Sequence, residues 1–263
     1  MDIIPVLDLA AGAAVLARAG ERARYEPVTS VLAPGAMGEP IALLRGFREI
    51  LGARSCYVAD LDAIQGGAVQ RSILTGLAEL AIGSAGPLLV DAGTHELSGA
   101  LEVLSCGASE IVVGLETLRS FADLAEIVNE VGTSRVDFSL DLRLGRPILH
   151  PELQDSGVSP DPIDLTARAL ETGVRSVLVV DIGRVGTGCG VDLGVVEALR
   201  RRFPSVRLLA GGGVLARRDL ERMRSAGCDA ALVASAIHRG AITSADVAAL
   251  ANPPRGPQSP ARD

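Results

Sequence analysis

Five aspartates, each at the end of a short apolar run, could supply the groups of an acid–base reaction: Asp8, Asp60, Asp91, Asp141 and Asp181. Carboxylates that share one site repel one another, which raises the pKa of some of them. One carboxyl group can then act as an acid while another stays a base. A single aspartate in such a place could instead cap the following helix. The whole group favours an acid–base site.

A second set of residues has the composition of a phosphate site. Gly211, Gly212 and Gly213, here called the glycine turn, end the seventh apolar run, and Ala234 and Ser235 follow the eighth. Glycines let backbone N–H groups approach phosphate oxygens, and the loops after strands seven and eight of a barrel often hold a phosphate. The alternative is a tight turn without a ligand. The position of the turn favours the phosphate site.

The elements that must position these residues recur along the chain. Eight short apolar or β-branched runs stop at Asp, Gly or Ala, and amphipathic stretches such as 41–51, 97–106, 118–131, 164–171, 193–203 and 217–225 lie between them. Apolar strands that alternate with helices are typical of parallel strands buried on both faces. The expected strands are 3–8, 55–60, 88–91, 110–114, 136–141, 177–181, 206–211 and 230–234.

This alternation predicts an α/β fold, a single (β/α)8 TIM barrel built from two repeated half-barrels. We expect the barrel to occupy residues 1–245, and the segment 252–263, rich in Pro, Gly, Ser and Arg, to be a disordered tail. A doubly wound open sheet is the alternative, but only Gly12 follows the first run, where that fold expects several glycines. In a barrel the active site lies at the carboxyl ends of the strands.

The spacing of the run ends indicates an internal duplication. The ends at Asp60, Asp91 and Gly114 are 31 and 23 residues apart, and the last three ends are 30 and 23 residues apart. Asp8 and Asp141 then correspond as the ends of the first and fifth strands. The repeat therefore places these two carboxylates on opposite sides of the barrel mouth, one as base and one as acid.

The duplicated turns differ in charge. Asp91 stands where the second half has Gly211, and Glu116 stands where it has Ala236. A second phosphate at the first-half turns would meet like charge. The sequence therefore predicts one strong phosphate site and not two.

The composition narrows the chemistry further. The 263 residues hold 32 Asp and Glu against 25 basic residues, all of them Arg, so the formal charge is −7. This balance argues against a nucleic-acid surface, and the lack of lysine excludes Schiff-base chemistry. The histidines and cysteines have no metal-ligand spacing, and no apolar run reaches the roughly 18 residues of a membrane span. We expect a cytoplasmic protein, monomeric or a small homo-oligomer, with a phosphorylated small molecule as its partner.

Several segments are similar to known motifs. In order along the chain they resemble those of the histidine-biosynthesis isomerase and cyclase barrels, over about residues 1–245 and closer to the isomerase branch. The segments are IPVLDL at 4–9, VADLDA at 58–63, FSLDLRLGR at 138–146, DIGRVGT at 181–187 and LAGGG at 209–213.

The resemblance implies an Amadori-type rearrangement, in which a phosphorylated ribosylamine is opened and converted from aldose to ketose without cofactor or metal. It implies that Asp8 is the general base at the sugar C2 and that Asp141 is the general acid for ring opening. The glycine turn and Ser235 would hold a phosphate. Neighbouring residues would contribute further substrate contacts: Asp60, Arg143, Asp181, Arg184, Thr187, Gly188 and Ala234.

Departures from the isomerase motif leave alternatives open. Val180 and Val185 stand where the isomerases usually carry Thr and Asp, and His95 stands where they carry Arg. The loop at 20–28 and the Asp91-Ala92-Gly93 turn resemble those of a divergent isomerase-like subgroup linked to methanopterin one-carbon pathways. One alternative is a metal-dependent lyase or aldolase, because the acidic rim would suit a hard cation. The other is a non-catalytic paralogue.

Overall fold

Eight parallel strands close into a barrel in the computed structural model, which describes residues 1–17, 25–82, 86–187, 190 and 192–251. Each strand pairs with the next along the chain, and β11 pairs with β1 to complete the ring. The predicted (β/α)8 barrel is therefore confirmed. Its strands are β1 (Asp2–Ala10), β4 (Cys56–Asp60), β5 (Leu88–Asp91), β6 (Glu110–Gly114), β7 (Val136–Arg143), β9 (Ser176–Asp181), β10 (Arg207–Gly211) and β11 (Ala230–Val233).

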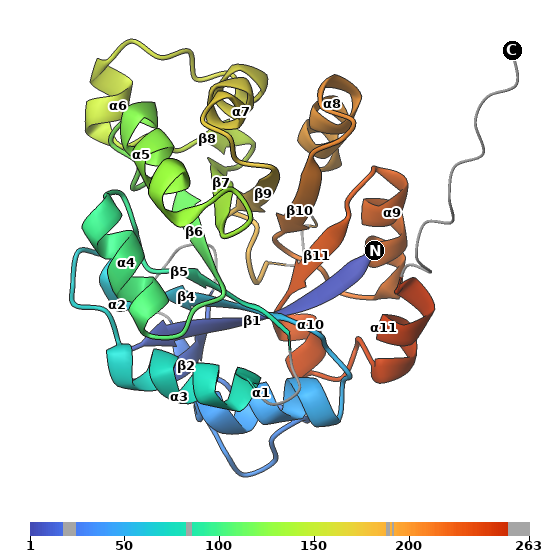
Figure 1. Cartoon of the computed structure of the whole chain (residues 1–263). Coiled ribbons are helices and arrows are strands. Elements are labelled where there is room, and N and C mark those ends of the chain that lie inside the picture. The colour runs from blue at the N-terminus through green and yellow to red at the C-terminus, as the bar shows by residue number, and fades with distance from the viewer. Residues whose placement is uncertain (18–24, 83–85, 188–189, 191, 252–263) are drawn as a thin grey trace, which may run out of the picture.

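Helices surround the ring of strands (Figure 1). Local sequence sets where several of them begin: Ser120 caps α5, Asp161 caps α7 with Pro162 directly after it, and Thr243 caps α11. The longer helices are α1 (Pro40–Glu49), α3 (Arg71–Ile82), α4 (Leu97–Ser105), α5 (Phe121–Val131), α7 (Pro162–Glu171), α8 (Leu193–Arg202), α9 (Arg217–Ser225) and α11 (Ser244–Leu250). The short ones are α2 (Leu61–Ile64), α6 (Pro151–Asp155) and α10 (Ser235–His238).

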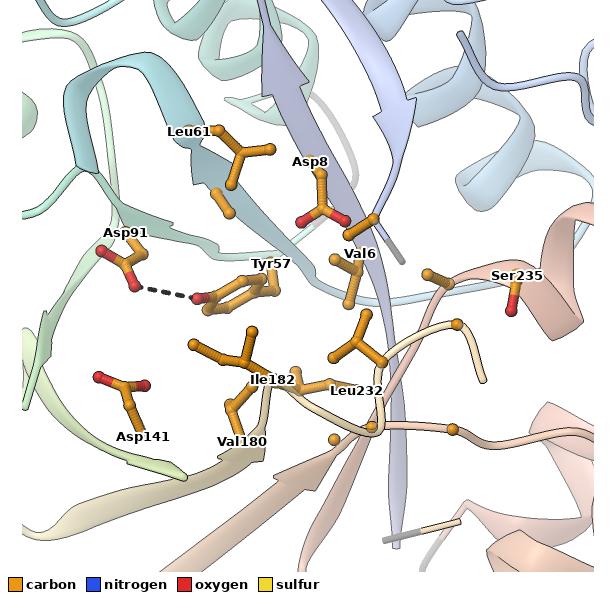
Figure 2. Close-up of a pocket in the computed structure, with 18 of the residues that line it drawn as sticks. Val6, Asp8, Tyr57, Leu61, Asp91, Asp141, Val180, Ile182, Leu232 and Ser235 are labelled. Carbon is orange, nitrogen blue, oxygen red and sulfur yellow. Dashed lines mark hydrogen bonds between the residues drawn. The ribbon is translucent and has the colours of Figure 1, made fainter. Parts of the chain in front are cut away.

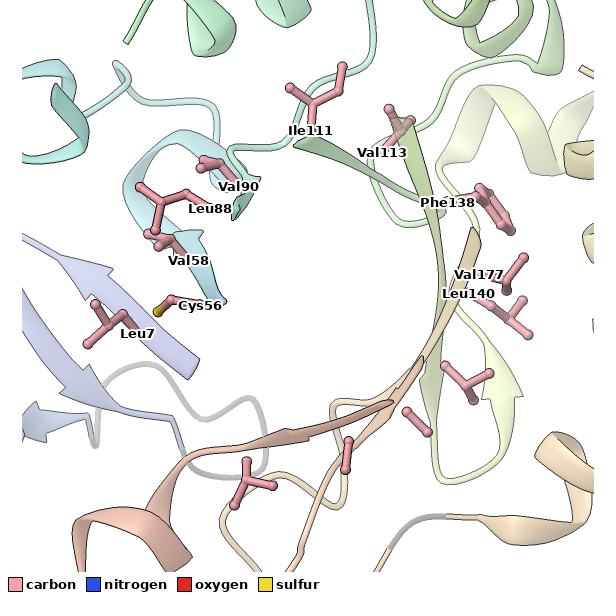
Figure 3. Packing of buried hydrophobic residues seen from close by; sticks show 14 of the residues in the cluster. Leu7, Cys56, Val58, Leu88, Val90, Ile111, Val113, Phe138, Leu140 and Val177 are labelled. Atoms are coloured by element: carbon pink, nitrogen blue, oxygen red, sulfur yellow. The ribbon is translucent and has the colours of Figure 1, made fainter. Parts of the chain in front are cut away.

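Two apolar clusters hold the barrel together. Side chains along a strand alternate between its two faces, so the strands contribute to both clusters. The larger cluster fills the space between strands and helices, and Figure 3 shows Val58, Phe138 and Val177 on this outer side. The smaller cluster fills the barrel interior, where Tyr57 and Leu89 lie. This alternation decides which residues at the strand ends face the barrel mouth.

Three short strands lie outside the ring and were not expected from the sequence. β2 (Ala13–Leu16) pairs antiparallel with the end of β1, and β3 (Glu26–Pro27) pairs with β2. β8 (Arg146–Pro147) pairs antiparallel with the end of β7. The strands that carry Asp8 and Asp141 therefore both continue past the rim into a hairpin.

None of the described helices is both long and apolar enough to cross a lipid bilayer.

Candidate active site

A cavity of about 320 Å³ opens at the carboxyl ends of the barrel strands. Every barrel strand, or the loop that follows it, contributes to its lining. The lining includes eight of the residues predicted as site residues: Asp8, Asp141, Arg143, Gly211, Gly212, Gly213, Ala234 and Ser235. These residues come from distant parts of the chain, and the closed barrel brings them to one place.

Asp8 and Asp141 face each other across this cavity. Figure 2 shows Asp8 on β1, Asp141 on the opposite side, and the ring of Tyr57 between them. Both side chains are buried, at 9% and 5% exposure. The apolar side chains of Val6 and Val180 also line the cavity and limit the contact of the carboxylates with water.

Burial raises the pKa of Asp8 from 3.8 to about 7, although a hydrogen bond from the backbone of Ala17 lowers it. A carboxyl group with this pKa is partly ionised at neutral pH and is a stronger base than an exposed aspartate. It can accept a proton from carbon and return it in the same catalytic cycle.

Asp141 is also held in its protonated form. Burial raises its pKa well above 3.8, and the negative charges of Glu116 and Asp91 raise it further. Two hydrogen bonds oppose this shift: Ser139 Oγ donates to Asp141 Oδ1 at 2.6 Å, and the Glu116 N–H donates to Oδ2 at 3.2 Å. A carboxyl group that stays protonated at neutral pH is suited to donate a proton.

Tyr57 belongs to the site, although the sequence analysis did not select it. Its hydroxyl donates to Asp91 Oδ2 at 3.2 Å, and both residues line the cavity. Burial and the surrounding carboxylates raise the pKa of Tyr57 well above 10, so the phenol stays a donor. Burial also raises the pKa of Asp91 to about 6, which the Glu116 charge reinforces. A tyrosine within an otherwise apolar barrel strand was the available signal.

Ser235 lies on the side of the cavity away from Asp91 and Asp141 (Figure 2), and the glycine turn also lines the cavity. Among the residues that the structure describes, the N–H groups of Gly213, Ser235 and Ala236 donate to no acceptor. Gly212 has φ +118°, and a Cβ there would lie 3.1 Å from the Asp181 carbonyl oxygen. This side therefore offers free backbone N–H groups that could donate hydrogen bonds to an anion.

The hairpins after Asp8 and Asp141 have the same turn. Ala11 and Gly12 have φ values of +47° and +86°, and Leu144 and Gly145 have φ values of +51° and +79°. Each turn begins three residues after its aspartate. Positive φ at both central residues is typical of a type I′ hairpin turn, and Gly adopts it at the second position without strain. The matching turns support the predicted half-barrel repeat.

Asp181 holds the second hairpin and does not line the cavity. Its Oδ1 accepts from the Leu144 N–H and its Oδ2 from the Gly145 N–H, both at 2.9 Å. Arg184 Nε also donates to Oδ2, at 3.1 Å. The carboxylate therefore fixes the turn directly after Arg143, a cavity residue.

Asp60 is the corresponding residue of the first half, and it acts through Gln70. Asp60 Oδ2 accepts from the Gln70 N–H at 2.7 Å, and Oδ1 accepts from Gln70 Nε2 at 2.9 Å. Gln70 Oε1 then accepts from the Gly12 N–H, and Asp62 accepts from the Ala11 N–H, both at 2.9 Å. Asp60 also lies outside the cavity lining and stabilises the turn after Asp8.

The other predicted contacts lie around the second hairpin. Arg184 pairs with Asp181 and, at 3.7 Å, with Asp192, and Thr187 donates to the Arg184 carbonyl oxygen. Neither Arg184 nor Thr187 lines the cavity. Gly188 lies outside the described residues. The described residues also contain no group of three His, Cys, Asp or Glu side chains placed to hold a metal ion.

Asp181→Asn is expected to lower the free energy of unfolding by about 2 kcal/mol, because an amide cannot accept from both turn N–H groups. The KM for substrate should rise as well, since Arg143 adjoins the released turn. Asp192→Asn is the matched control. Asp192 caps α8 by accepting from the Gly194 N–H, which Asn also does, and its contact with Arg184 is long. Equal losses of stability in urea unfolding of the two variants would contradict this role of Asp181.

Comparison with known proteins agrees with this geometry. The profile of a family described as histidine biosynthesis protein matches residues 2–243. A relative from Thermus thermophilus is 33% identical over 243 residues, which cover 92% of this chain and 96% of the relative. One from Deinococcus radiodurans is 31% identical over 242 residues, covering 92% and 95%. Both are named as isomerases of an imidazole-4-carboxamide that carries a phosphoribosyl and a phosphoribosylamino group. The chain therefore belongs to the histidine biosynthesis protein family.

Proposed function

We propose that this chain is an aldose–ketose isomerase of the Amadori type, acting without a cofactor on a phosphorylated ribosylamine. The observation that carries this proposal is the pair of buried carboxyl groups, Asp8 and Asp141, on opposite sides of one cavity. The names of the relatives support the same reaction class.

In the proposed mechanism Asp141 starts the reaction by donating its proton to the ring oxygen. The bond between C1 and that oxygen breaks, and the amine nitrogen supplies the electrons that form an imine. Asp8 then removes the proton from C2, which gives an enolamine. Protonation at C1 and loss of the proton from the C2 hydroxyl yield the aminoketose. Every proton that leaves the substrate is balanced by one that returns, so no oxidant or metal is required.

The glycine turn and Ser235 are the proposed phosphate site. Their N–H groups and the Ser235 hydroxyl surround one side of the cavity with donors. Binding energy from a phosphate there would hold the sugar carbons between the two carboxyl groups, and such orientation lowers the barrier of the chemical steps. Arg143 at the rim is proposed as a further contact.

The pH profile of kcat/KM should have two limbs. The base must be ionised, so activity should fall about tenfold per pH unit below the Asp8 pKa of about 7. The acid must be protonated, so activity should fall again once the pH exceeds the raised pKa of Asp141. Rates measured from pH 5 to 10 test this, and a flat profile below pH 7 would contradict Asp8 as the base.

A direct assay tests the function. The purified chain is incubated in deuterated water with the aminoaldose that the relatives' name describes and with analogues lacking either of its phosphates. Carbon and proton magnetic resonance then follow the ketose product and the deuterium gained at C1. We expect turnover of at least one of them with kcat/KM of about 10⁴ M⁻¹ s⁻¹ or more. No turnover of any of them by the folded protein would remove the isomerase proposal.

The cytoplasmic location, the absence of a nucleic-acid partner and the monomeric or small homo-oligomeric state stay predictions from the sequence. The same holds for the barrel boundary at residue 245, although the last described helix, α11, continues to Leu250.

A further inference from the structure

The Tyr57 hydroxyl lies among the three aspartates that line the cavity. Tyr57 belongs to β4 and is only 7% exposed, and its ring lies between Asp8 and Asp141 (Figure 2). Burial raises the pKa of its phenol, and the charges of Asp91, Asp141 and Asp8 raise it further. The hydroxyl is therefore within electrostatic reach of all three carboxyl groups.

The hydrogen bonds of this hydroxyl have a direction. Tyr57 donates to Asp91 Oδ2 at 3.2 Å, and Asp91 Oδ1 accepts from the Gly93 N–H at 3.0 Å. No group in the described part of the chain donates to the Tyr57 oxygen. A phenol oxygen can accept one hydrogen bond while it donates another. A substrate hydroxyl in the cavity can therefore donate to Tyr57 while Tyr57 donates to Asp91.

The last step of the proposed isomerisation requires a proton acceptor of this kind. When the enolamine becomes the ketose, the C2 hydroxyl loses its proton and C1 gains one. Asp8 then holds the proton taken from C2 and supplies it to C1, so Asp8 cannot accept another at the same time. Asp141 has lost its proton in ring opening, and the hydroxyl formed in that step lies beside it. Tyr57 is the group between these two aspartates.

We propose that the C2 hydroxyl gives its proton to the Tyr57 oxygen while the Tyr57 hydroxyl passes its own proton to Asp91. The electron pair of the O–H bond forms the C2 carbonyl, and the pair of the C1–C2 double bond takes the proton from Asp8. Tyr57 is the catalytic residue of this step, and Asp91 acts through it. Asp91 later releases its proton to solvent and Asp141 regains one, so the protons balance over the cycle. This inference rests on the proposed function, because it assigns the final step of that reaction.

The acidities of the two groups agree with this relay. Burial raises the pKa of Asp91 to about 6, so at neutral pH the group is mostly ionised and can accept a proton that it later releases. The raised pKa of Tyr57 keeps the phenol protonated, so it passes one proton on only as it receives another.

Removal of the hydroxyl tests the step. Tyr57→Phe keeps the buried ring and should lower kcat about tenfold or more on whichever of the three aminoaldoses of the direct assay the wild type converts. In deuterated water, an enolamine that cannot lose its hydroxyl proton should return to the aldose. Magnetic resonance should then show about tenfold or more deuterium at C2 of the recovered aldose, per ketose formed, relative to the wild type. An unchanged ratio would overturn the relay, because a merely displaced site would slow proton removal from C2 as well.

A second variant separates the proton acceptor from the hydrogen bond. In Asp91→Asn the amide oxygen can still accept from the Tyr57 hydroxyl but cannot take its proton, so the same rise in C2 deuterium is expected. Thr166→Val removes a buried hydroxyl and Asp137→Asn a buried carboxyl group, both outside the cavity lining. These matched controls should keep the wild-type ratio. The wild-type ratio in Asp91→Asn would overturn the role of Asp91.

The outcomes separate this inference from the proposed function. Turnover by Tyr57→Phe with the wild-type rate and deuterium ratio would overturn the relay and leave the isomerase function standing. No turnover of any of the three compounds by the folded wild type would overturn both. Urea unfolding checks that each variant folds, and if Tyr57→Phe does not, Asp91→Asn decides by the same ratio.

Discussion

Asp8→Asn should lower kcat by about 10² to 10⁴, because the variant has no base to remove the proton from C2. An amide has nearly the same shape as the carboxyl group, so binding of the substrate should change much less than kcat. The acid limb of the pH profile should disappear from the residual activity. A loss below tenfold would contradict the assignment of Asp8 as the base.

The same variant should be more stable than the wild type at pH 8. The pKa of Asp8 is about 7 in the folded protein and near 3.8 in the unfolded chain, so between these values only the folded state binds the proton. The wild type therefore loses stability as the pH rises from about 4 to 7, and the loss stays constant above 7. Removing the buried charge should recover about 1 to 4 kcal/mol at pH 8.

Asp2→Asn is the matched control for both measurements. Asp2 begins the same strand, β1, at the opposite end of the barrel, and its side chain is exposed. This change should alter neither kcat nor the pH dependence of unfolding in urea. Loss of activity together with gained stability in Asp8→Asn alone would separate a catalytic role from a structural one.

Asp141→Asn should also lower kcat by about 10² to 10⁴ for a substrate with a closed ring, because no proton is donated to the ring oxygen. The amide can keep both local hydrogen bonds: its oxygen can accept from the Glu116 N–H while its NH2 group donates to Ser139 Oγ. The fold around the site should therefore survive, and circular dichroism and urea unfolding check this.

An open-chain analogue distinguishes the two carboxyl groups. If the ring-closing 4-hydroxyl is absent, no ring needs to be opened, so Asp141→Asn should act on this analogue within tenfold of the wild-type rate. Asp8→Asn should remain slow on it, since C2 must still lose its proton. Equal losses of Asp141→Asn on closed and open substrates would contradict its role as the ring-opening acid.

The sequence predicts the eight barrel strands well because most of them are continuous apolar runs, as strands buried on both faces are. The same property hides which face a residue takes. Tyr57 faces the interior and Val58 faces the helices, but both belong to one unbroken apolar run. The short strands β2 and β8 were missed because their hairpin turns carry Ala11 and Leu144 at positions where positive φ is uncommon.

The sequence does not show which of the aspartates at the strand ends face the cavity. Asp8 and Asp141 lie an even number of residues from interior side chains, Val6 and Ser139, and so face the cavity. Asp60 follows Ala59, an interior residue, by one position, and therefore takes the other face. The sequence alone does not distinguish these positions, because it does not locate the end of a strand to within one residue. Only the register of the barrel separates cavity residues from those that hold the hairpins.

The unlike turns at the two ends of the cavity also give the site a direction. Asp8 and Asp141 are related by the half-barrel repeat, so a molecule with two identical ends could enter in either of two orientations. In one of them the wrong carbon would face Asp8, and the bound molecule would only obstruct the site. With free donors at the glycine turn and carboxylates at Asp91 and Glu116, a molecule with unlike ends has one favourable orientation. Each binding event then presents the same carbon to the base.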